Sequence, residues 1–214
     1  MPEFSYVIVA VCAYLVGSIP TGFLVARAKG VDIRKVGSGN MGATNVFRSV
    51  GKSWGIFVLV VDGLKGYAAC TWMGDLLLHF IAAPPDVDLM RIIAGIAAVL
   101  GHNYTCWLKF KGGKGIATSA GVYFALAPWA VTIALGTWIV VVTLTRYVSM
   151  ASIAAAIALP TAVWLMYRES LTLPLATTAL GIMAIVNHKK NIKRLMEGTE
   201  SRFGKKTPTP EAAK

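Results

Sequence analysis

The chain has 214 residues, of which 56% are hydrophobic and only 14% are charged, with 21 Lys or Arg against 10 Asp or Glu. Since a soluble domain carries about a quarter of its residues as charges, a chain with a mean hydropathy of +0.62 cannot cover a water-facing surface. The same values exclude disorder, because disordered chains have low hydrophobicity. The composition therefore predicts an integral membrane protein.

Long apolar stretches mark the membrane spans that we expect, because a helix that crosses the hydrocarbon core needs about 20 apolar residues. Each of five stretches is predicted to form one transmembrane helix, and only the second of them contains charges. They run from Phe4 to Ala26, from Ser53 to Gly74, from Ile92 to Leu108, from Tyr147 to Tyr167 and from Ser170 to Asn187.

The stretch from Gly115 to Thr145 has 31 residues without a charge, which would make a helix of about 46 Å, too long for one upright span. Pro128 divides it into a short span, Gly115 to Ala127, and a longer one. Six Lys or Arg lie in residues 27–52, three in 109–114 and eight after 188, with single ones between. Seven spans place every basic connection on one side, as the positive-inside rule requires. We therefore predict an all-α polytopic membrane protein with seven transmembrane helices, the N-terminus outside and the C-terminus in the cytoplasm.

We expect one transmembrane domain over residues 1–204 and a disordered tail over 205–214. The net charge of +11 follows from the topology, because basic residues on the cytoplasmic side face anionic lipid headgroups. A nucleic-acid partner is therefore not expected. The three cysteines lie in apolar segments, and zinc, calcium and dinucleotide motifs are absent from the sequence, so we predict no metal and no cofactor.

The segment from Val36 to Arg48, VGSGNMGATNVFR, is the first that carries chemistry. Glycines allow backbone N–H groups to turn toward an anion, short polar side chains add donors, and Arg48 can hold two phosphate oxygens. A flexible connector is the alternative, because Gly, Ser and Asn are ordinary loop residues.

The segment from Gly101 to Gly115, GHNYTCWLKFKGGKG, is the second. Its last five residues open the short predicted helix, whose free N–H groups make a second anion site. It is not a Walker loop, because Gly115 stands where Ser or Thr is required. His102 lies deeper in the apolar stretch, where a hydrogen-bonded helix contact is the alternative to a functional role.

The segment from Val186 to Gly204 is the third, and in it His188 and Asn191 are three residues apart and share a helix face. The basic residues around them can form a stop-transfer cluster, but such a cluster does not need His188 or Asn191. For Glu197 we favour an ion-pair partner over a base.

Asp62 and Lys65 form a smaller feature inside the second predicted span. They share a helix face at a depth where ionisable groups are costly and point to a function. An internal ion pair that only holds the bundle together is the alternative, and the sequence does not decide between the two.

Together these stretches resemble the integral-membrane acyl-phosphate:glycerol-3-phosphate acyltransferases of bacteria, the family that makes lysophosphatidic acid. Several motifs in one order carry the resemblance along nearly the whole chain. They are GSIPTG from Gly17, GSGNMGATN from Gly37, DGLKG from Asp62, GHNY from Gly101, FKGGKG from Phe110 and NHKKNIKRL from Asn187.

The resemblance implies a role for each candidate residue. The phosphate of glycerol 3-phosphate would be held by Asn40, Arg48 and Lys114, with Gly112, Gly113 and Gly115 allowing its approach. The catalytic residues would be Ser38, His188 and Asn191, which hold the phosphate of the acyl phosphate near the attacking hydroxyl. The substrate-binding set is completed by Thr44, Asn45, Lys65 and His102.

The resemblance also implies the surroundings of the site. The partners would be the two small-molecule substrates and the lipid bilayer, with the acyl chain in a groove between helices. We expect a monomer in the bacterial cytoplasmic (inner) membrane, with the active site facing the cytoplasm.

The chemistry fits these residues, because an acyl phosphate already has a good leaving group. The enzyme needs mainly to bring two dianions together, neutralise them and aim a hydroxyl at the carbonyl. His188, with a reference pKa of ~6.5, can take the hydroxyl proton. Alternatively, His188 donates a hydrogen bond and a phosphate oxygen takes the proton, or Ser38 acts as an acylated nucleophile.

Other function classes make weaker matches to the sequence. Acyl-CoA-dependent acyltransferases carry His followed five positions later by Asp, and none of the three histidines here has that partner. A transporter of a phosphorylated anion would use the same basic loops, but transporters often have internal repeats and a midplane site. A scaffold that binds anionic lipid leaves His188 and Asn191 unexplained.

Overall fold

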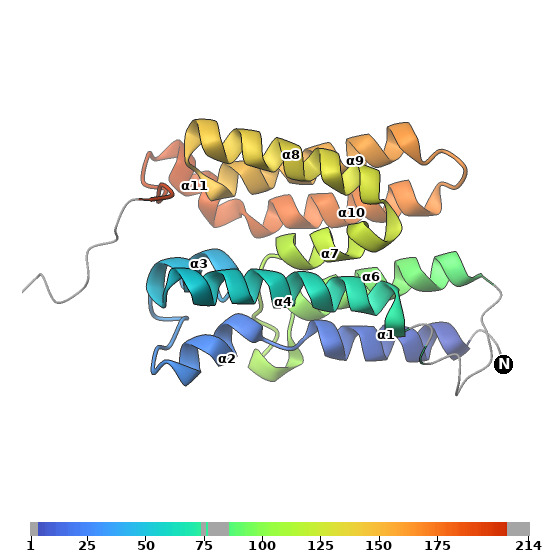
Figure 1. Ribbon diagram of the computed structural model, residues 1–214, viewed down its shortest axis with the longest axis horizontal. Helices are drawn as coiled ribbons and strands as arrows, with labels where there is room; N and C mark the ends of the chain where they lie inside the picture. Colours follow the sequence, from blue (N-terminus) through green and yellow to red (C-terminus); the bar gives the residue numbers. More distant parts are fainter. Residues whose placement is uncertain (1–3, 74–75, 77–85, 205–214) are drawn as a thin grey trace, which may run out of the picture.

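The computed structural model describes residues 4–73, 76 and 86–204, and throughout this part of the chain the secondary structure is helical (Figure 1). One short 3₁₀ turn, Cys106–Leu108, accompanies the α-helices. The helices are α1 (Phe4–Gly17), α2 (Thr21–Ala28), α3 (Ala43–Ser49), α4 (Lys52–Cys70), α6 (Val87–Asn103), α7 (Ile116–Leu126), α8 (Pro128–Thr145), α9 (Val148–Met166), α10 (Thr172–Asn187) and α11 (Lys189–Met196).

The helices form two groups with α7 between them (Figure 1). Helices α1, α4 and α6 pack together on one side, and α8, α9 and α10 on the other, while α7 contacts α4, α6 and α8. Helices α3 and α11 lie at the same end of the bundle, which we call the polar end.

Four segments in the described part are long and apolar enough to cross a membrane: residues 4–28, α4, α8 and α9. Helices α7 and α10 are shorter apolar helices, and α6 has 17 residues. The described part of the chain is thus all helical, as predicted, and contains helices suited to a membrane, while seven crossings and their orientation stay predictions. The connection around Pro84 and Pro85 and the tail 205–214 lie outside the described residues.

The division at Pro128 is confirmed, because α7 ends at Leu126 and α8 begins with the proline. Proline is favoured at the first position of a helix, where its missing N–H would have no partner. The expected end of the third span at Leu108 is wrong, since α6 ends at Asn103. The backbone N–H groups of Gly112 and Gly113 donate to the carbonyls of Asn103 and His102 over 2.9 and 3.0 Å, and the chain turns back there.

The first expected span, Phe4 to Ala26, is also not one continuous helix. Helix α1 ends at Gly17 and α2 begins at Thr21, with Pro20 between them. Proline lacks a backbone N–H and its ring clashes with the preceding turn, so the helix breaks there. We call residues 18–20 the α1–α2 break.

The freed carbonyls of the break have partners from other elements. Thr105 donates its hydroxyl to the carbonyl of Ser18 over 2.6 Å, and the Lys65 ammonium donates to the carbonyl of Ile19 over 3.0 Å. Asp62 lies 2.8 Å from the same ammonium, so the ion pair considered as an alternative for these residues is present. The break is stable inside the bundle because these polar groups satisfy it.

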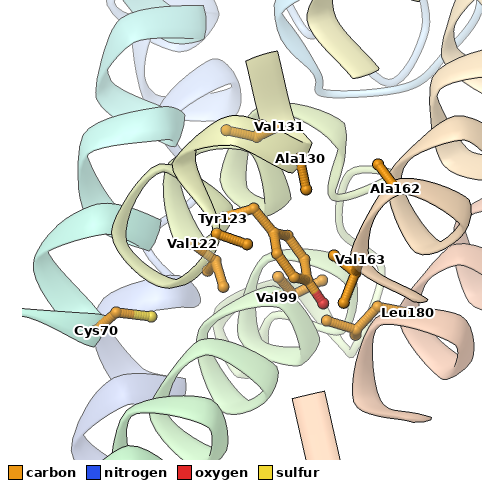
Figure 2. Close-up of a cluster of buried hydrophobic side chains, with 10 residues drawn as sticks. Cys70, Val99, Val122, Tyr123, Ala130, Val131, Ala162, Val163 and Leu180 are labelled. Atoms are coloured by element: carbon orange, nitrogen blue, oxygen red, sulfur yellow. The ribbon is translucent and has the colours of Figure 1, made fainter. Parts of the chain in front are cut away.

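The main hydrophobic core forms around Tyr123 of α7 (Figure 2). Its ring lies among Val99 of α6, Val163 of α9 and Leu180 of α10, and only 1% of the residue is exposed. Aromatic side chains bury a large apolar area. Tyr123 therefore joins the two groups of helices from a position between them.

Small residues allow α4 and α7 to approach closely. A Cβ on Gly121 of α7 would lie 1.8 Å from the carbonyl oxygen of Gly63 in α4, and a Cβ on Gly66 would lie 2.2 Å from the carbonyl oxygen of Thr118. Close approach at small residues is typical of membrane helices, which gain stability from packing.

A Gly121→Ala variant is expected to push α4 and α7 apart and to lower the free energy of unfolding by about 1–3 kcal/mol, as overpacking does. Thermal denaturation in detergent should show a lower Tm. Gly136→Ala is the matched control, because nothing lies within 4 Å of a Cβ there. An unchanged Tm in Gly121→Ala would contradict the close contact.

Candidate active site

A cavity of about 420 Å³ occupies the space between the two helix groups. At the polar end it is lined by the loop before α3, by Lys114 and by residues after α10; deeper, it is lined by apolar residues of α7, α8, α9 and α10. Ten of the thirteen predicted site residues line it. They are Ser38, Asn40, Thr44, Asn45, Arg48, His102, Lys114, Gly115, His188 and Asn191.

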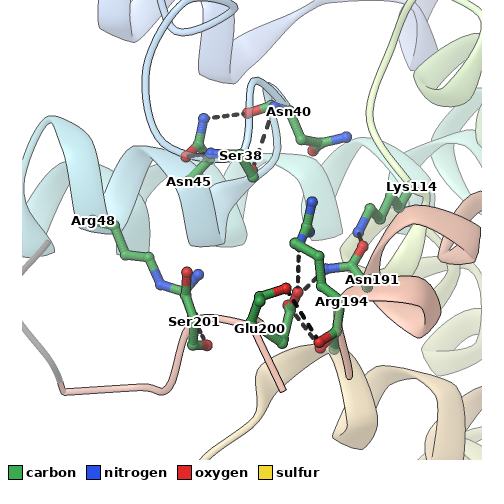
Figure 3. Close-up of polar contacts among 11 residues, drawn as sticks. Ser38, Asn40, Asn45, Arg48, Lys114, Asn191, Arg194, Glu200 and Ser201 are labelled. Carbon is green, nitrogen blue, oxygen red and sulfur yellow. Dashed lines mark hydrogen bonds and ion pairs between the residues drawn. The ribbon is translucent and has the colours of Figure 1, made fainter. Parts of the chain in front are cut away.

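The loop before α3 is held in place by Asn45, which is 4% exposed. Its side-chain amide donates to the carbonyls of Ile33, Val36 and Asn40 over 3.2, 3.0 and 2.8 Å, and its oxygen accepts from the Ser38 backbone N–H over 3.0 Å (Figure 3). These bonds occupy both N–H groups of the Asn45 side-chain amide. Asn45 therefore shapes the loop that presents Ser38 and Asn40.

A polar network connects Lys114 to the C-terminal segment (Figure 3). The Lys114 ammonium donates to the side-chain oxygen of Asn191, whose amide donates to Glu200 Oε1 over 2.7 Å. Arg194 donates to Glu200 Oε2 over 2.6 Å, and Ser149 donates to Oε1 over 2.9 Å. Glu200 is thus the negative centre of the polar end, where Arg48, Lys114 and Arg194 are positive.

Two pKa values follow from this arrangement. Burial alone would raise the pKa of Glu200, but hydrogen bonds from Arg194, Asn191 and Ser149 hold it below its usual range. Burial lowers the pKa of Lys114 to about 8, with the charges of Arg194 and Arg48 adding to the effect and Glu200 opposing it. The positive groups at the polar end are therefore close enough to affect one another.

Arg48 projects from α3 across the polar end and donates to the carbonyl of Ser201 over 3.0 Å (Figure 3). The segment that follows α11 continues along the bundle, where the ring centroids of Phe203 and Phe47 are 5.4 Å apart. The Phe203 N–H donates to the carbonyl of Arg146 over 2.6 Å. This return of the chain brings Glu200 and Ser201 to the cavity.

His188, at the junction of α10 and α11, is 3% exposed. Its Nδ1 lies 2.7 Å from the carbonyl of Ala184, and a carbonyl only accepts, so Nδ1 carries the proton. Burial and the charge of Lys114 lower the pKa of His188 to about 4. The neutral ring therefore has a free lone pair on Nε2.

Three predicted residues do not line the cavity. The Lys65 ammonium, 7% exposed, is bound to Asp62 and to the carbonyl of Ile19. Gly112 and Gly113 lie against His102 instead. A Cβ on Gly113 would come within 2.1 Å of His102 Nε2, and a Cβ on Gly112 within 2.0 Å of the His102 carbonyl oxygen. Their lack of side chains serves the packing of the loop.

Several polar residues that line the cavity were not predicted, among them Ser149, Arg194, Glu200 and Ser201. Glu197, the expected ion-pair partner, forms an exposed pair with Lys193 at 3.7 Å. Glu200 follows Gly198, whose φ of +67° lets the chain leave the helix and turn back. In the sequence, a glycine that can end a helix, followed by an acidic residue, was the available signal for Glu200. For Ser149, the signal was a polar residue inside an apolar span.

The family model of glycerol-3-phosphate acyltransferase matches residues 7–198 of the chain. The chain belongs to the glycerol-3-phosphate acyltransferase family. Among curated proteins of this name, that of Geobacter sulfurreducens is 47% identical over 196 residues, which cover 92% of this chain and 96% of that protein. The protein of Geobacter metallireducens is 50% identical over 195 residues, which cover 89% of this chain and 94% of that protein.

Two solved structures of PlsY (YgiH), an integral membrane glycerol 3-phosphate acyltransferase, have the same fold as this family member. The glycerol 3-phosphate form has a TM-score of 0.84 and 38% identity, and covers 94% of this chain and 96% of its own. The lysophosphatidic acid form has a TM-score of 0.81 and 37% identity, with the same coverage.

The lowered pKa of Lys114 predicts that this acyltransferase binds glycerol 3-phosphate less tightly as the pH rises above about 8, where the ammonium loses its proton. The phosphate of the ligand has a second pKa of about 6 and stays a dianion throughout this range. Binding is measured by the ligand-induced rise in Tm between pH 7 and 9.5. Lys114→Arg should remove the dependence, and an equal decline in that variant would exclude Lys114 as its cause.

Proposed function

We propose that this protein transfers a fatty acyl group from an acyl phosphate to glycerol 3-phosphate, giving 1-acyl-glycerol 3-phosphate and inorganic phosphate in phospholipid biosynthesis. The observation that carries the proposal is one cavity with two chemical halves. Arg48, Lys114 and Arg194 make its polar end positive, and the deeper part between α7 and α10 is apolar. A phosphorylated polyol and a fatty acyl phosphate together need both halves.

The polar end supplies groups for two phosphates. Arg48 and Lys114, with Asn40, would hold the phosphate of glycerol 3-phosphate, since charge-assisted hydrogen bonds to phosphate are strong. Ser38 and Asn191 would hold the phosphate of the acyl donor. The acyl chain would extend along α9 and α10, where Ala155, Leu159 and Gly181 line the cavity.

In the reaction, a hydroxyl oxygen of glycerol 3-phosphate attacks the acyl carbonyl carbon, and the bond from this carbon to the phosphate oxygen breaks. Phosphate leaves with the electron pair. The hydroxyl proton passes to Nε2 of His188, whose lone pair is free because Nδ1 donates to Ala184. Two phosphate dianions beside His188 would raise its pKa from the value in the empty site, which makes it a stronger base.

A transporter would need a path from one side of the membrane to the other. The apolar half of the cavity is lined by residues of the buried core, among them Tyr123, Val131 and Leu180. No described residue there offers charge to a phosphorylated anion, so this geometry favours the acyltransferase.

Purified protein given acyl phosphate and glycerol 3-phosphate is expected to release inorganic phosphate, while acyl-CoA is expected to be inert. His188→Gln should lower kcat at least about 100-fold, the usual range for a general base. Lys190→Gln is the control, because Lys190 is exposed and does not line the cavity. Without phosphate release from the unaltered protein, the transporter becomes the better explanation.

The proposed topology has seven crossings in the bacterial inner membrane, with the N-terminus outside and the polar end in the cytoplasm, and a monomer as its assembly. Three predicted basic connections carry exposed residues, Lys35, Lys111 and Lys190, and Glu169 is exposed in the connection between α9 and α10.

To test this topology, a single cysteine is placed at each of these four positions after Cys12, Cys70 and Cys106 are changed to Ala. An impermeant maleimide applied to spheroplasts should label Glu169→Cys and spare Lys35→Cys, Lys111→Cys and Lys190→Cys. The pattern should reverse in inverted vesicles. Labelling of the three basic positions from different sides would overturn the topology.

A further inference from the structure

Asp62 and Lys65 form a buried ion pair that the proposed reaction does not use. Asp62 is 2% exposed and Lys65 is 7% exposed, and both lie in α4. The Lys65 ammonium donates to the carbonyl of Ile19 in the α1–α2 break, and the hydroxyl of Thr21 in α2 donates to Asp62 Oδ1 over 3.0 Å. These contacts give the pair a structural role. They do not explain why Asp62 lines the cavity while Lys65 does not.

The further neighbour of Asp62 is His102, near the end of α6. Nδ1 of His102 lies 3.7 Å from Asp62 Oδ1, and His102 also lines the cavity. This distance exceeds that of a hydrogen bond, but a carboxylate so near attracts an N–H and favours the tautomer with the proton on Nδ1. Asp62 thus faces the imidazole ring of His102 from the side of α4.

The opposite side of His102 supports the loop that carries Lys114. Nε2 lies so near Gly113 that a Cβ there would come within 2.1 Å of it. The carbonyl of His102 accepts from the Gly113 N–H over 3.0 Å. The ring and the backbone carbonyl of His102 therefore both contact Gly113, the residue that precedes Lys114.

We propose that Asp62 is a positioning residue for glycerol 3-phosphate: it orients His102, which supports Gly113 and so places the Lys114 ammonium at the polar end of the cavity. The inference rests on the proposed function for the identity of the ligand. Lys65 neutralises Asp62, so that this positioning adds no net charge inside the bundle. Asp62 itself does not touch the reacting atoms.

A purely structural ion pair makes different predictions from a positioning residue. Loss of a structural pair lowers stability and affects both substrates alike. Loss of positioning weakens glycerol 3-phosphate alone, and because Asp62 acts through His102, the effects of changing both residues are not additive. The two cases can therefore be separated by kinetics.

The experiment compares Asp62→Asn, His102→Gln and the double variant with the unaltered protein. Asn keeps an oxygen that accepts from Thr21 and Lys65, so the α1–α2 break keeps its partners. We expect KM for glycerol 3-phosphate to rise about tenfold in each variant, since small misplacement of a binding group has effects of this size or larger. The values of kcat and of KM for acyl phosphate should change less than about twofold, as for a group that binds ground state and transition state equally.

The double variant should be no worse than His102→Gln alone. Glu197→Gln is the matched carboxylate-to-amide control in an exposed ion pair, and it should behave as the unaltered protein. If Asp62→Asn fails to fold, Asp62→Asn/Lys65→Met removes both charges and takes its place. A KM effect in the double variant equal to the product of the single effects would overturn the inference, and so would unchanged kinetics in Asp62→Asn.

A second measurement separates this inference from the proposed function. Glycerol 3-phosphate should raise the Tm of the unaltered protein, and the rise should be much smaller in Asp62→Asn. If the protein shows this rise without releasing phosphate from acyl phosphate, the proposed reaction fails and the positioning role is still tested by the Tm shift. If glycerol 3-phosphate never shifts Tm, the positioning role is overturned.

Discussion

Inside a membrane, a backbone polar group that a helix leaves unpaired must find its partner within the protein, because no water is present to replace it. The α1–α2 break shows how this constraint connects the molecule. The carbonyls of Ser18 and Ile19 accept hydrogen bonds from Thr105 and Lys65, and Lys65 in turn pairs with Asp62. One interruption of a helix therefore joins α2, α4 and the segment that leads to Lys114.

At the polar end of the cavity, the arrangement of charges is the deciding constraint. Arg48, Lys114 and Arg194 repel one another, which is part of why the pKa of Lys114 is lowered. Glu200 supplies the opposite charge from a segment that follows the last helix and returns to the bundle. The site is thus assembled from the loop before α3, α3 itself, the loop before α7 and the C-terminal segment.

Some of the fold was accessible from the sequence because the decisive residues act locally. Pro128 ends one helix and begins the next whatever surrounds it, and the 31-residue charge-free stretch could not have been one span. Pro20 was not recognised in the same way, because a proline inside an apolar stretch can also bend a helix without breaking it. The break at Pro20 depends on Lys65 and Thr105, which lie far from it in the sequence.

For the site, the sequence by itself determined which residue types were available: the glycine-rich loops, Arg48, Lys114, and His188 with Asn191 on one helix face. It did so because short-range spacing and local charge are properties of adjacent residues. Only the tertiary structure decided that Glu200 neutralises the site, that Asn45 and Gly113 serve the loops, and that Lys65 lies outside the cavity. These roles depend on contacts between residues distant in the chain, which form only when the helices have packed.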